Sequence, residues 1–291
     1  MRNVYFIIAS IQPSDVLVAF LKSIENILPE ANDKGVVRLI ISCSYSEEQL
    51  DSFYASTKNL GLNSTLILHR EDKGLLARFN RALETLDDLN DDDILLFCND
   101  DLLLDEGFVK QLFSLPSKGY LAGPMARGVD GHVQISIYRK KFTPWLLFWR
   151  LYDGGLYSIF LNKERLRKMD INLDRETVDG CCFILPGNVI KQIGGRFDDS
   201  IYLYGEEIYL QYLVRSYNLK CFVDHKLTLI HSGGATLTNN WTVWRSKVQR
   251  KSRLYAAKRY MNCNTFVIAL IYIHATTEMG IRRSLNILLR R

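Results

Sequence analysis

The sequence predicts an α/β protein with a mostly parallel β-sheet flanked by helices. The chain has 291 residues, of which 47% are hydrophobic and 24% are charged, a composition typical of a globular protein with a sizeable core. Over residues 1–125, apolar runs typical of strands alternate with segments of helical periodicity. Four such strand–helix units in succession favour a Rossmann-like sheet with right-handed crossovers.

The first half of the chain supplies most of the expected strands and helices. Short, mainly apolar runs bounded by polar turns predict strands at 4–10, 36–43, 64–69, 93–98 and 121–125. Helical spacing of apolar residues predicts four helices between and after them: 13–27, 46–60, 76–83 and 106–115. Ser46 and Gln49 have the spacing of a capping box, which marks the start of the second of these helices.

The pattern is interrupted after residue 126 and then resumes. Residues 127–177 mix glycine, aromatic and charged residues, and no element is assigned there. Beyond them we expect a strand at 181–185, helices at 188–193 and from Glu206 onwards, and short strands at 221–223 and 228–230. These elements belong to a catalytic body over 1–240, followed by a basic amphipathic helical extension over 241–291.

The net charge of +5 is unevenly distributed. Residues 242–291 hold eleven Lys or Arg and one acid, so the other 241 residues carry 26 basic and 31 acidic side chains. Bulky apolar residues alternate with these bases, a mixture typical of helices at an anionic membrane surface. We therefore expect a cytoplasmic protein, peripheral on the inner face of the cell membrane, with no nucleic-acid partner. A solvated extension or a homodimer contact is the alternative for this segment.

Targeting and redox signals agree with that location. The apolar stretch at residues 4–8 is too short for the hydrophobic region of a signal peptide, and no late apolar run reaches the ~20 residues of a spanning helix. The six cysteines show no C-x-x-C spacing and no zinc-type grouping with histidine. We expect them to be reduced.

Carboxylates follow the strand predicted at 93–98. Asn99, Asp100 and Asp101 come directly after it, at the edge of an α/β sheet where ligands bind. Hard oxygen ligands of this kind suit Mg²⁺ or Mn²⁺, and either ion would bridge a diphosphate. An acidic turn without a ligand, or the N-cap of the following helix, explains the same residues without a metal.

Two further motifs carry chemically useful side chains. Glu206 and Glu207 follow an aromatic-glycine turn at a predicted helix N-terminus, where the helix dipole favours their ionised form and either could act as a general base. His231 ends a predicted strand and precedes the small residues Ser232-Gly233-Gly234. One of its nitrogens could bind a metal, although a lone histidine is more often structural.

Together the motifs resemble those of family 2 glycosyltransferases, in particular the rhamnosyl- and galactofuranosyl-transferase-like branch. The run 194–236 is similar to the signature GG-F-D…F-x-Y-G-E-D-x-D-L…H-x-x-G-x-S, and Asn99-Asp100-Asp101 resembles the N-x-D or D-x-D motif. The segment 73–80 is similar to the N-x-G…ARN-type segment of the family. The resemblance as a whole covers roughly residues 3–240. It implies a GT-A fold and inverting sugar transfer from a UDP- or dTDP-type donor to a saccharide or lipid-linked saccharide.

The resemblance also implies roles for individual residues. Asp101 and His231 are the implied metal ligands, and Glu207 takes the position of the catalytic base, with Glu206 as the alternative. The implied nucleotide-sugar-binding residues are Ser10, Ser42, Lys73, Gly74, Arg78, Asn80, Asn99, Asp100, Asp179 and Gly180.

The sequence departs from the family pattern at two positions. The strand predicted at 36–43 ends in Ser42-Cys43-Ser44, without the aspartate that contacts the nucleobase in the family. Glu207 stands where the family has aspartate, and its extra methylene would displace the carboxylate by about 1 Å, enough to cost ~100-fold in rate if nothing compensates. A degenerate transferase that acts as a scaffold at the membrane is therefore the alternative. The N-terminal loop lacks the Gly-rich, basic pattern expected of a sugar-nucleotide pyrophosphorylase.

Overall fold

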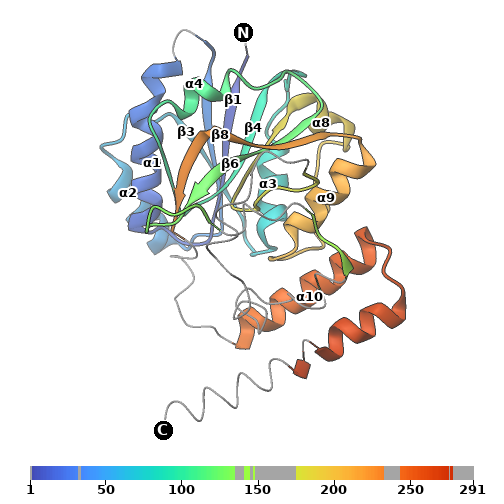
Figure 1. The fold of residues 1–291 in the computed structure, drawn as a ribbon. Coiled ribbons are helices and arrows are strands. Elements are labelled where there is room, and N and C mark those ends of the chain that lie inside the picture. The colour runs from blue at the N-terminus through green and yellow to red at the C-terminus, as the bar shows by residue number, and fades with distance from the viewer. Residues whose placement is uncertain are drawn as a thin grey trace.

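The computed structural model describes residues 2–31, 34–134, 141–144, 147, 175–232, 243–274 and 276–277. An eight-stranded sheet runs through the body of the molecule in the order β3-β2-β1-β4-β7-β6-β8-β5, with helices packed against it (Figure 1). The predicted α/β class is therefore confirmed.

The first four strands form the parallel half of the sheet. They are β1 (Val4–Ser10), β2 (Val37–Cys43), β3 (Ser64–Leu68) and β4 (Ile94–Asn99). β1 lies between β2 and β4, and β3 pairs with the outer side of β2, all in parallel. All seven residues of β1 are buried, which fits an apolar run covered on both faces.

Three helices connect these strands, as predicted. They are α1 (Asp15–Ile27), α2 (Glu47–Thr57) and α3 (Leu75–Leu83), with a short 3₁₀ turn over Leu28–Ala31 after α1. Ser14 caps α1 by accepting a hydrogen bond from the Leu17 N–H. The predicted capping box of α2 is present, because the side chains of Ser46 and Gln49 each accept from the other's backbone N–H.

The second half of the sheet is mixed, because β6 and β8 pair in parallel whereas the other pairings are antiparallel. It comprises β5 (Leu102–Leu104), β6 (Tyr120–Arg127), β7 (Cys182–Pro186) and β8 (Lys220–His231). β7 lies between β4 and β6 and runs antiparallel to both, so β6 does not extend the parallel series directly. The two short strands expected near 221–230 form the single strand β8, whose register against β6 shifts between Pro124 and Met125.

The helices of this half are α4 (Phe108–Leu112), α8 (Gly187–Gln192) and α9 (Glu206–Ser216). α4 is shorter than the predicted 106–115 because Gly107, in a left-handed conformation, precedes its first turn. Four phenylalanines pack together with ring centroids 4.9 to 5.9 Å apart, one pair stacked and the others edge to face: Phe79, Phe97, Phe183 and Phe197. They join α3, β4, β7 and the loop before α9 into one core.

The C-terminal helix α10 (Val243–Tyr260) lies against α9, below the sheet in the view of Figure 1. A second helical stretch over residues 265–274 follows it. The buried face of α10 is made mostly of small and polar residues: Gln249, Ser252, Arg253, Ala256 and Ala257. In the described part of the chain, no helix combines the length and the apolar character that crossing a membrane requires.

Candidate active site

The carboxyl ends of β1, β2 and β4 bring the predicted binding residues to one edge of the sheet. In the register of the parallel strands, Ala9 is opposite both Ser42 and Asn99. Ser10 and Asp100 each follow by one residue, so polar side chains from three strands end side by side. Ligand sites in open α/β sheets lie at this kind of edge.

Asp100 is buried and is held by a short chain of hydroxyl groups. The Ser10 hydroxyl donates to Asp100 Oδ2 at 2.7 Å, and the Tyr45 hydroxyl donates to Ser10 Oγ at 2.6 Å. Burial raises the pKa of the Tyr45 phenol well above its ordinary value, so it remains a donor at neutral pH. Tyr45, which comes two residues after β2, was not singled out in the sequence.

Asp101 and His231 lie together on neighbouring strands. β5 and β8 pair antiparallel with Leu102 opposite His231, and the Ser232 N–H donates to the Asp101 carbonyl at 3.0 Å. This pairing places His231 Nε2 3.4 Å from Asp101 Oδ1, with Asp101 only 3% exposed. Burial acts to lower the pKa of His231, but the hydrogen bond and charge of Asp101, with the charge of Asp179, raise it overall.

Gln134 fixes the orientation of the His231 ring. Its amide nitrogen donates to the His231 carbonyl at 3.0 Å, so its amide oxygen faces His231 Nδ1 at 2.9 Å. An amide oxygen only accepts, so Nδ1 carries a hydrogen in this pair. Nε2 is then the nitrogen directed at Asp101. An outer partner of this kind is usual for a histidine that binds a metal.

The segment Asp179–Gly180 connects this pair to Glu207. Asp179 is close enough to contribute to the raised pKa of His231, and its carboxylate accepts from the Cys181 N–H at 2.9 Å. The Asn99 N–H donates to the Cys181 carbonyl, which ties the end of β4 to the same segment. A Cβ added to Gly180 would lie 3.6 Å from Glu207 Cγ and Cδ. The half-buried Glu207 side chain therefore lies beside Gly180, in the neighbourhood of Asp101 and His231.

Glu206 has a different environment from Glu207. It is 5% exposed, and its two carboxylate oxygens accept from the backbone N–H groups of Tyr204 and Gly205 at 2.9 and 2.8 Å. Burial raises its pKa, while these hydrogen bonds and the charge of Arg253 act to lower it. Both oxygens of Glu206 are used to cap the turn before α9, so Glu207 is the better placed of the two for a general base.

A second group surrounds Arg78 at the ends of β2 and β3. Arg78 is 2% exposed and pairs with Asp72 at 2.7 Å. The Ser42 hydroxyl donates to the Arg78 carbonyl at 2.8 Å and contacts His69 Nε2. The Nε of Arg78 is buried and makes no hydrogen bond to a described residue.

Gly74 and Lys73 lie in the loop that leads into α3. Gly74 has φ 98°, and a Cβ there would lie 2.2 Å from the Tyr202 carbonyl oxygen, so only glycine fits. The Leu75 N–H donates to that carbonyl at 2.9 Å, and the Tyr202 hydroxyl donates to Asp72 at 2.6 Å. The loop is thus attached to the segment that leads to Glu206 and Glu207, whereas Lys73 is exposed.

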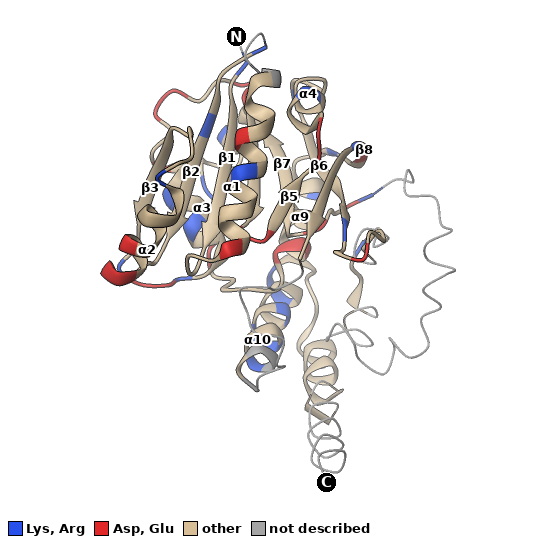
Figure 2. Cartoon of the chain, turned by 90° about the vertical axis from the view of Figure 1, so that its left-hand side faces the viewer, with Lys and Arg blue, Asp and Glu red and all other residues tan. Residues whose placement is uncertain are grey.

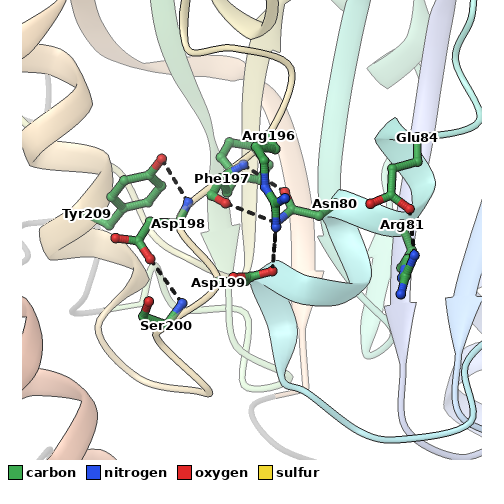
Figure 3. A network of polar contacts seen from close by, with 9 residues as sticks. All are labelled: Asn80, Arg81, Glu84, Arg196, Phe197, Asp198, Asp199, Ser200 and Tyr209. Carbon is green, nitrogen blue, oxygen red and sulfur yellow. Dashed lines mark hydrogen bonds and ion pairs between the residues drawn. The ribbon is translucent and has the colours of Figure 1, made fainter.

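Asn80, for which the resemblance implied a binding role, is hydrogen-bonded to the loop before α9. Its amide group donates to the Phe197 carbonyl at 2.9 Å and accepts from the Phe197 N–H at 2.7 Å, with a longer contact to Asp199 (Figure 3). Residues two apart on a helix point in nearly opposite directions, so Asn80 faces away from the Arg78 group. It holds the Gly194–Asp199 turn against α3.

The described residues thus gather most of the predicted site in two adjoining groups. One contains Ser10, Asn99, Asp100, Asp101, Asp179, Gly180, Glu207 and His231, and the other contains Ser42, Gly74 and Arg78. Tyr45 joins the first group through its hydrogen bond to Ser10, and the charge of Arg78 in the second group also acts on its phenol. Gly233–Thr236, the end of the predicted histidine motif, lie outside the described residues, as do 135–140 and most of 141–174.

Comparisons with known proteins show the fold. No family model matches the sequence, and no curated protein matches it significantly. Among solved structures, the mannosyltransferase PcManGT of Pyrobaculum calidifontis, in complex with GDP-Man and Mn²⁺, superposes with a TM-score of 0.57 at 10% identity, covering 97% of this chain and 75% of that one. GalNAc-T7 with UDP, GalNAc and Mn²⁺ gives 0.57 at 14% identity, covering 88% of this chain and 48% of that one.

A third structure, S. aureus TarS in complex with UDP, superposes with a TM-score of 0.55 at 11% identity, over 89% of this chain and 66% of that one. The chain thus spans about half the length of GalNAc-T7 and about two thirds that of the TarS fragment. At these identities the similarity concerns the arrangement of the backbone. That arrangement is shared by sugar-nucleotide-binding transferases from several sources, and the chain has the GT-A fold.

Proposed function

We propose that the protein is an inverting glycosyltransferase of the family 2 type, in the rhamnosyl- or galactofuranosyl-transferase-like branch. It would move a sugar from a UDP- or dTDP-type donor to a saccharide or lipid-linked saccharide in surface-glycan synthesis. The observation that carries the proposal is the contact between Asp101 and His231, with Glu207 beside Gly180, the neighbour of an aspartate whose charge acts on His231. A candidate metal pair and a candidate base thus come from three distant parts of the chain to one region.

Glu207 would act as the general base. Its carboxylate takes the proton of the acceptor hydroxyl as the hydroxyl oxygen bonds to the anomeric carbon of the donor sugar. The bond from that carbon to the diphosphate oxygen breaks in the same step, and the electron pair leaves with the nucleoside diphosphate. A single displacement of this kind inverts the anomeric configuration. Arg78 and Lys73 would be the cations that meet the diphosphate.

The residues present suit Mg²⁺ or Mn²⁺. Asp101 offers a buried carboxylate, and His231 offers Nε2 because Gln134 occupies Nδ1. The described residues contain no cluster of three or more His, Cys, Asp or Glu side chains that could enclose a metal. Two protein ligands, with diphosphate oxygens completing the shell, is the arrangement that Mg²⁺ commonly adopts with nucleotides. The metal would neutralise charge on the departing diphosphate.

The test is release of nucleoside diphosphate from a panel of UDP-, dTDP- and GDP-sugars, with extracted glycolipids as acceptors and with Mg²⁺ or Mn²⁺. We expect one donor to be turned over, and turnover to stop with EDTA or with Asp101→Ala. Nucleotide binding without turnover of any donor would instead favour a degenerate transferase that serves as a scaffold. Failure to bind any nucleotide would exclude the transferase altogether.

We further propose that α10 docks the enzyme on an anionic membrane. Its exposed face carries Trp244, Lys247, Lys251, Tyr255 and Lys258 at helical spacing. No acid occurs in α10, and its basic residues are seen along its length in Figure 2. Phe266 and Ile273 in the next helical stretch are 71% and 61% exposed. Aromatic side chains among lysines are typical of helices that lie in the lipid interface.

Replacement of Lys247, Lys251 and Lys258 by glutamine is expected to weaken binding to anionic vesicles by roughly 100-fold, since each base near such a surface contributes about 1 kcal/mol. Co-sedimentation with phosphatidylcholine vesicles, with and without an anionic phospholipid, measures this. A matched triple variant of exposed lysines on the body, Lys22, Lys34 and Lys58, should bind like the unaltered protein. Equal binding to neutral vesicles would contradict the proposal, and concentration-dependent self-association would assign the face to a homodimer.

A further inference from the structure

The turn before α9 is held in a conformation that the chain seldom adopts unaided. Tyr204 has φ 64° and Gly205 has φ 156°, and Gly205 is the N-cap residue of α9 with no side chain to cap the helix. A non-glycine residue at positive φ is uncommon and costs free energy, so neighbouring groups must stabilise it. Glu207 follows this turn by two residues, so the direction of its carboxylate depends on the turn.

Glu206 supplies the stabilising contacts from within the turn. Its two oxygens accept from the Tyr204 and Gly205 N–H groups at 2.9 and 2.8 Å, so the side chain closes the turn on itself. The side chain is 5% exposed. A carboxylate buried to this extent is unfavourable unless a positive charge accompanies its hydrogen bonds.

α10 supplies that charge and also covers the turn. Arg253 is 4% exposed, and its charge acts on Glu206. The preceding residue packs directly against the turn, since a Cβ on Gly205 would lie 3.4 Å from the Ser252 carbonyl oxygen. α10 therefore contacts the turn at the residue next to Arg253.

α10 holds the same segment at both of its ends. The Trp244 ring meets the Tyr202 ring edge-on at 6.2 Å, two residues before Tyr204. At the other end of the helix, the Tyr260 hydroxyl donates to Asp198 Oδ2 at 2.6 Å. Contacts at the start, middle and end of α10 thus fix the residues that lead to the proposed base.

We propose that α10, which packs on Gly205 through Ser252, holds the Tyr204–Gly205 turn and positions Glu207, and that the buried Glu206 and Arg253 interact through their charges across this contact. Glu206 is then a positioning residue rather than the base, and the C-terminal helix is part of the active site as well as a docking surface. The inference rests on the proposed function in assigning Glu207 as the base, whereas the interaction of Glu206 with Arg253 does not depend on the reaction.

The proposal is tested in the full-length protein with Glu206→Gln, Arg253→Met and the double variant. Each single variant should lower kcat at least about 10-fold and change the donor KM less than about 3-fold, because a small displacement of the base affects the chemical step more than donor binding. The lysine side chain of Arg253→Lys is nearly as long as methionine but keeps the positive charge. This variant should therefore retain more of kcat than Arg253→Met. The control is Arg215→Met, which removes an exposed arginine of α9 that pairs with Glu176. This variant should behave like the unaltered protein.

Two further measurements do not depend on activity. Hydrogen exchange at the Tyr204 and Gly205 amides should be faster in Glu206→Gln and Arg253→Met but not in Arg215→Met. The fall in unfolding midpoint of the double variant should be smaller than the sum of the two single falls, since paired residues are not additive.

Additive falls in the unfolding midpoint would overturn the proposed interaction of Glu206 with Arg253. Unchanged hydrogen exchange at the Tyr204 and Gly205 amides in Arg253→Met would do the same. A loss of kcat in Glu206→Gln as large as in Glu207→Gln, with exchange unchanged, would make Glu206 the base. If the unaltered protein turns over no donor, the proposed function fails, but exchange and unfolding still decide whether Glu206 and Arg253 interact.

Discussion

Replacement of Glu207 by glutamine is expected to lower kcat for sugar transfer by about 10³-fold, within the range that a general base contributes. Glutamine has the same shape and keeps the contact beside Gly180, but its neutral amide cannot take the acceptor proton. Affinity for nucleotide and Mn²⁺ should change little, since Asp101 and His231 are untouched. Release of nucleoside diphosphate at saturating donor, with nucleotide binding measured by calorimetry, separates the two effects.

Two variants serve as controls for this result. Glu206→Gln should retain measurable turnover, because Glu206 is committed to the backbone of its own turn. Glu207→Asp introduces the residue that the family 2 pattern has at this position but withdraws the carboxylate by about 1 Å, which can lower the rate by ~100-fold in a site built for the longer side chain. A Glu207→Gln variant with unaltered kcat would show that Glu207 is not the base.

The parallel half of the fold follows directly from the sequence. β1, β2 and β4 are apolar runs long enough to be recognised, and α1 and α2 begin at capping residues that the sequence displays. The second half of the sheet could be predicted less well, because the sequence has no local signal for the direction in which a strand pairs with its neighbour. The buried run of β7 reads the same in either direction, and the three residues of β5 are too few to show a period.

The candidate-site residues that could be predicted are those next to a strand or helix that the sequence pattern reveals. Asp101 follows a buried strand and His231 ends one, so the sheet edge brings them together across 130 positions. Gln134 belongs to a stretch without periodicity, and its contact with His231 follows only from the sheet pairing. The different environments of Glu206 and Glu207 are also set by the turn geometry, since the two adjacent carboxylates look equivalent in the sequence.

Gly74→Ala is expected to be strongly destabilising and to disturb the active site as well. The added methyl group would lie 2.2, 2.6 and 2.7 Å from three backbone atoms of Tyr202, which no side-chain rotation can relieve. The positive φ adds about 1–2 kcal/mol for any residue other than glycine. Overpacking against the backbone adds a further 1–3 kcal/mol or so. Thermal unfolding followed by circular dichroism measures the sum.

Gly119→Ala separates the two causes, because Gly119 has φ 70° but open space where its Cβ would lie. The free energy of unfolding of Gly119→Ala should fall only by the cost of the positive φ, about 1–2 kcal/mol. Its turnover should be unchanged. In Gly74→Ala the Tyr202 carbonyl must move, so the bond from the Leu75 N–H is lost and the segment leading to Glu207 shifts. Its kcat should therefore fall even at temperatures where the variant is fully folded. Equal losses of stability in the two variants, with normal turnover in both, would mean that the contact between this loop and Tyr202 does not support the site.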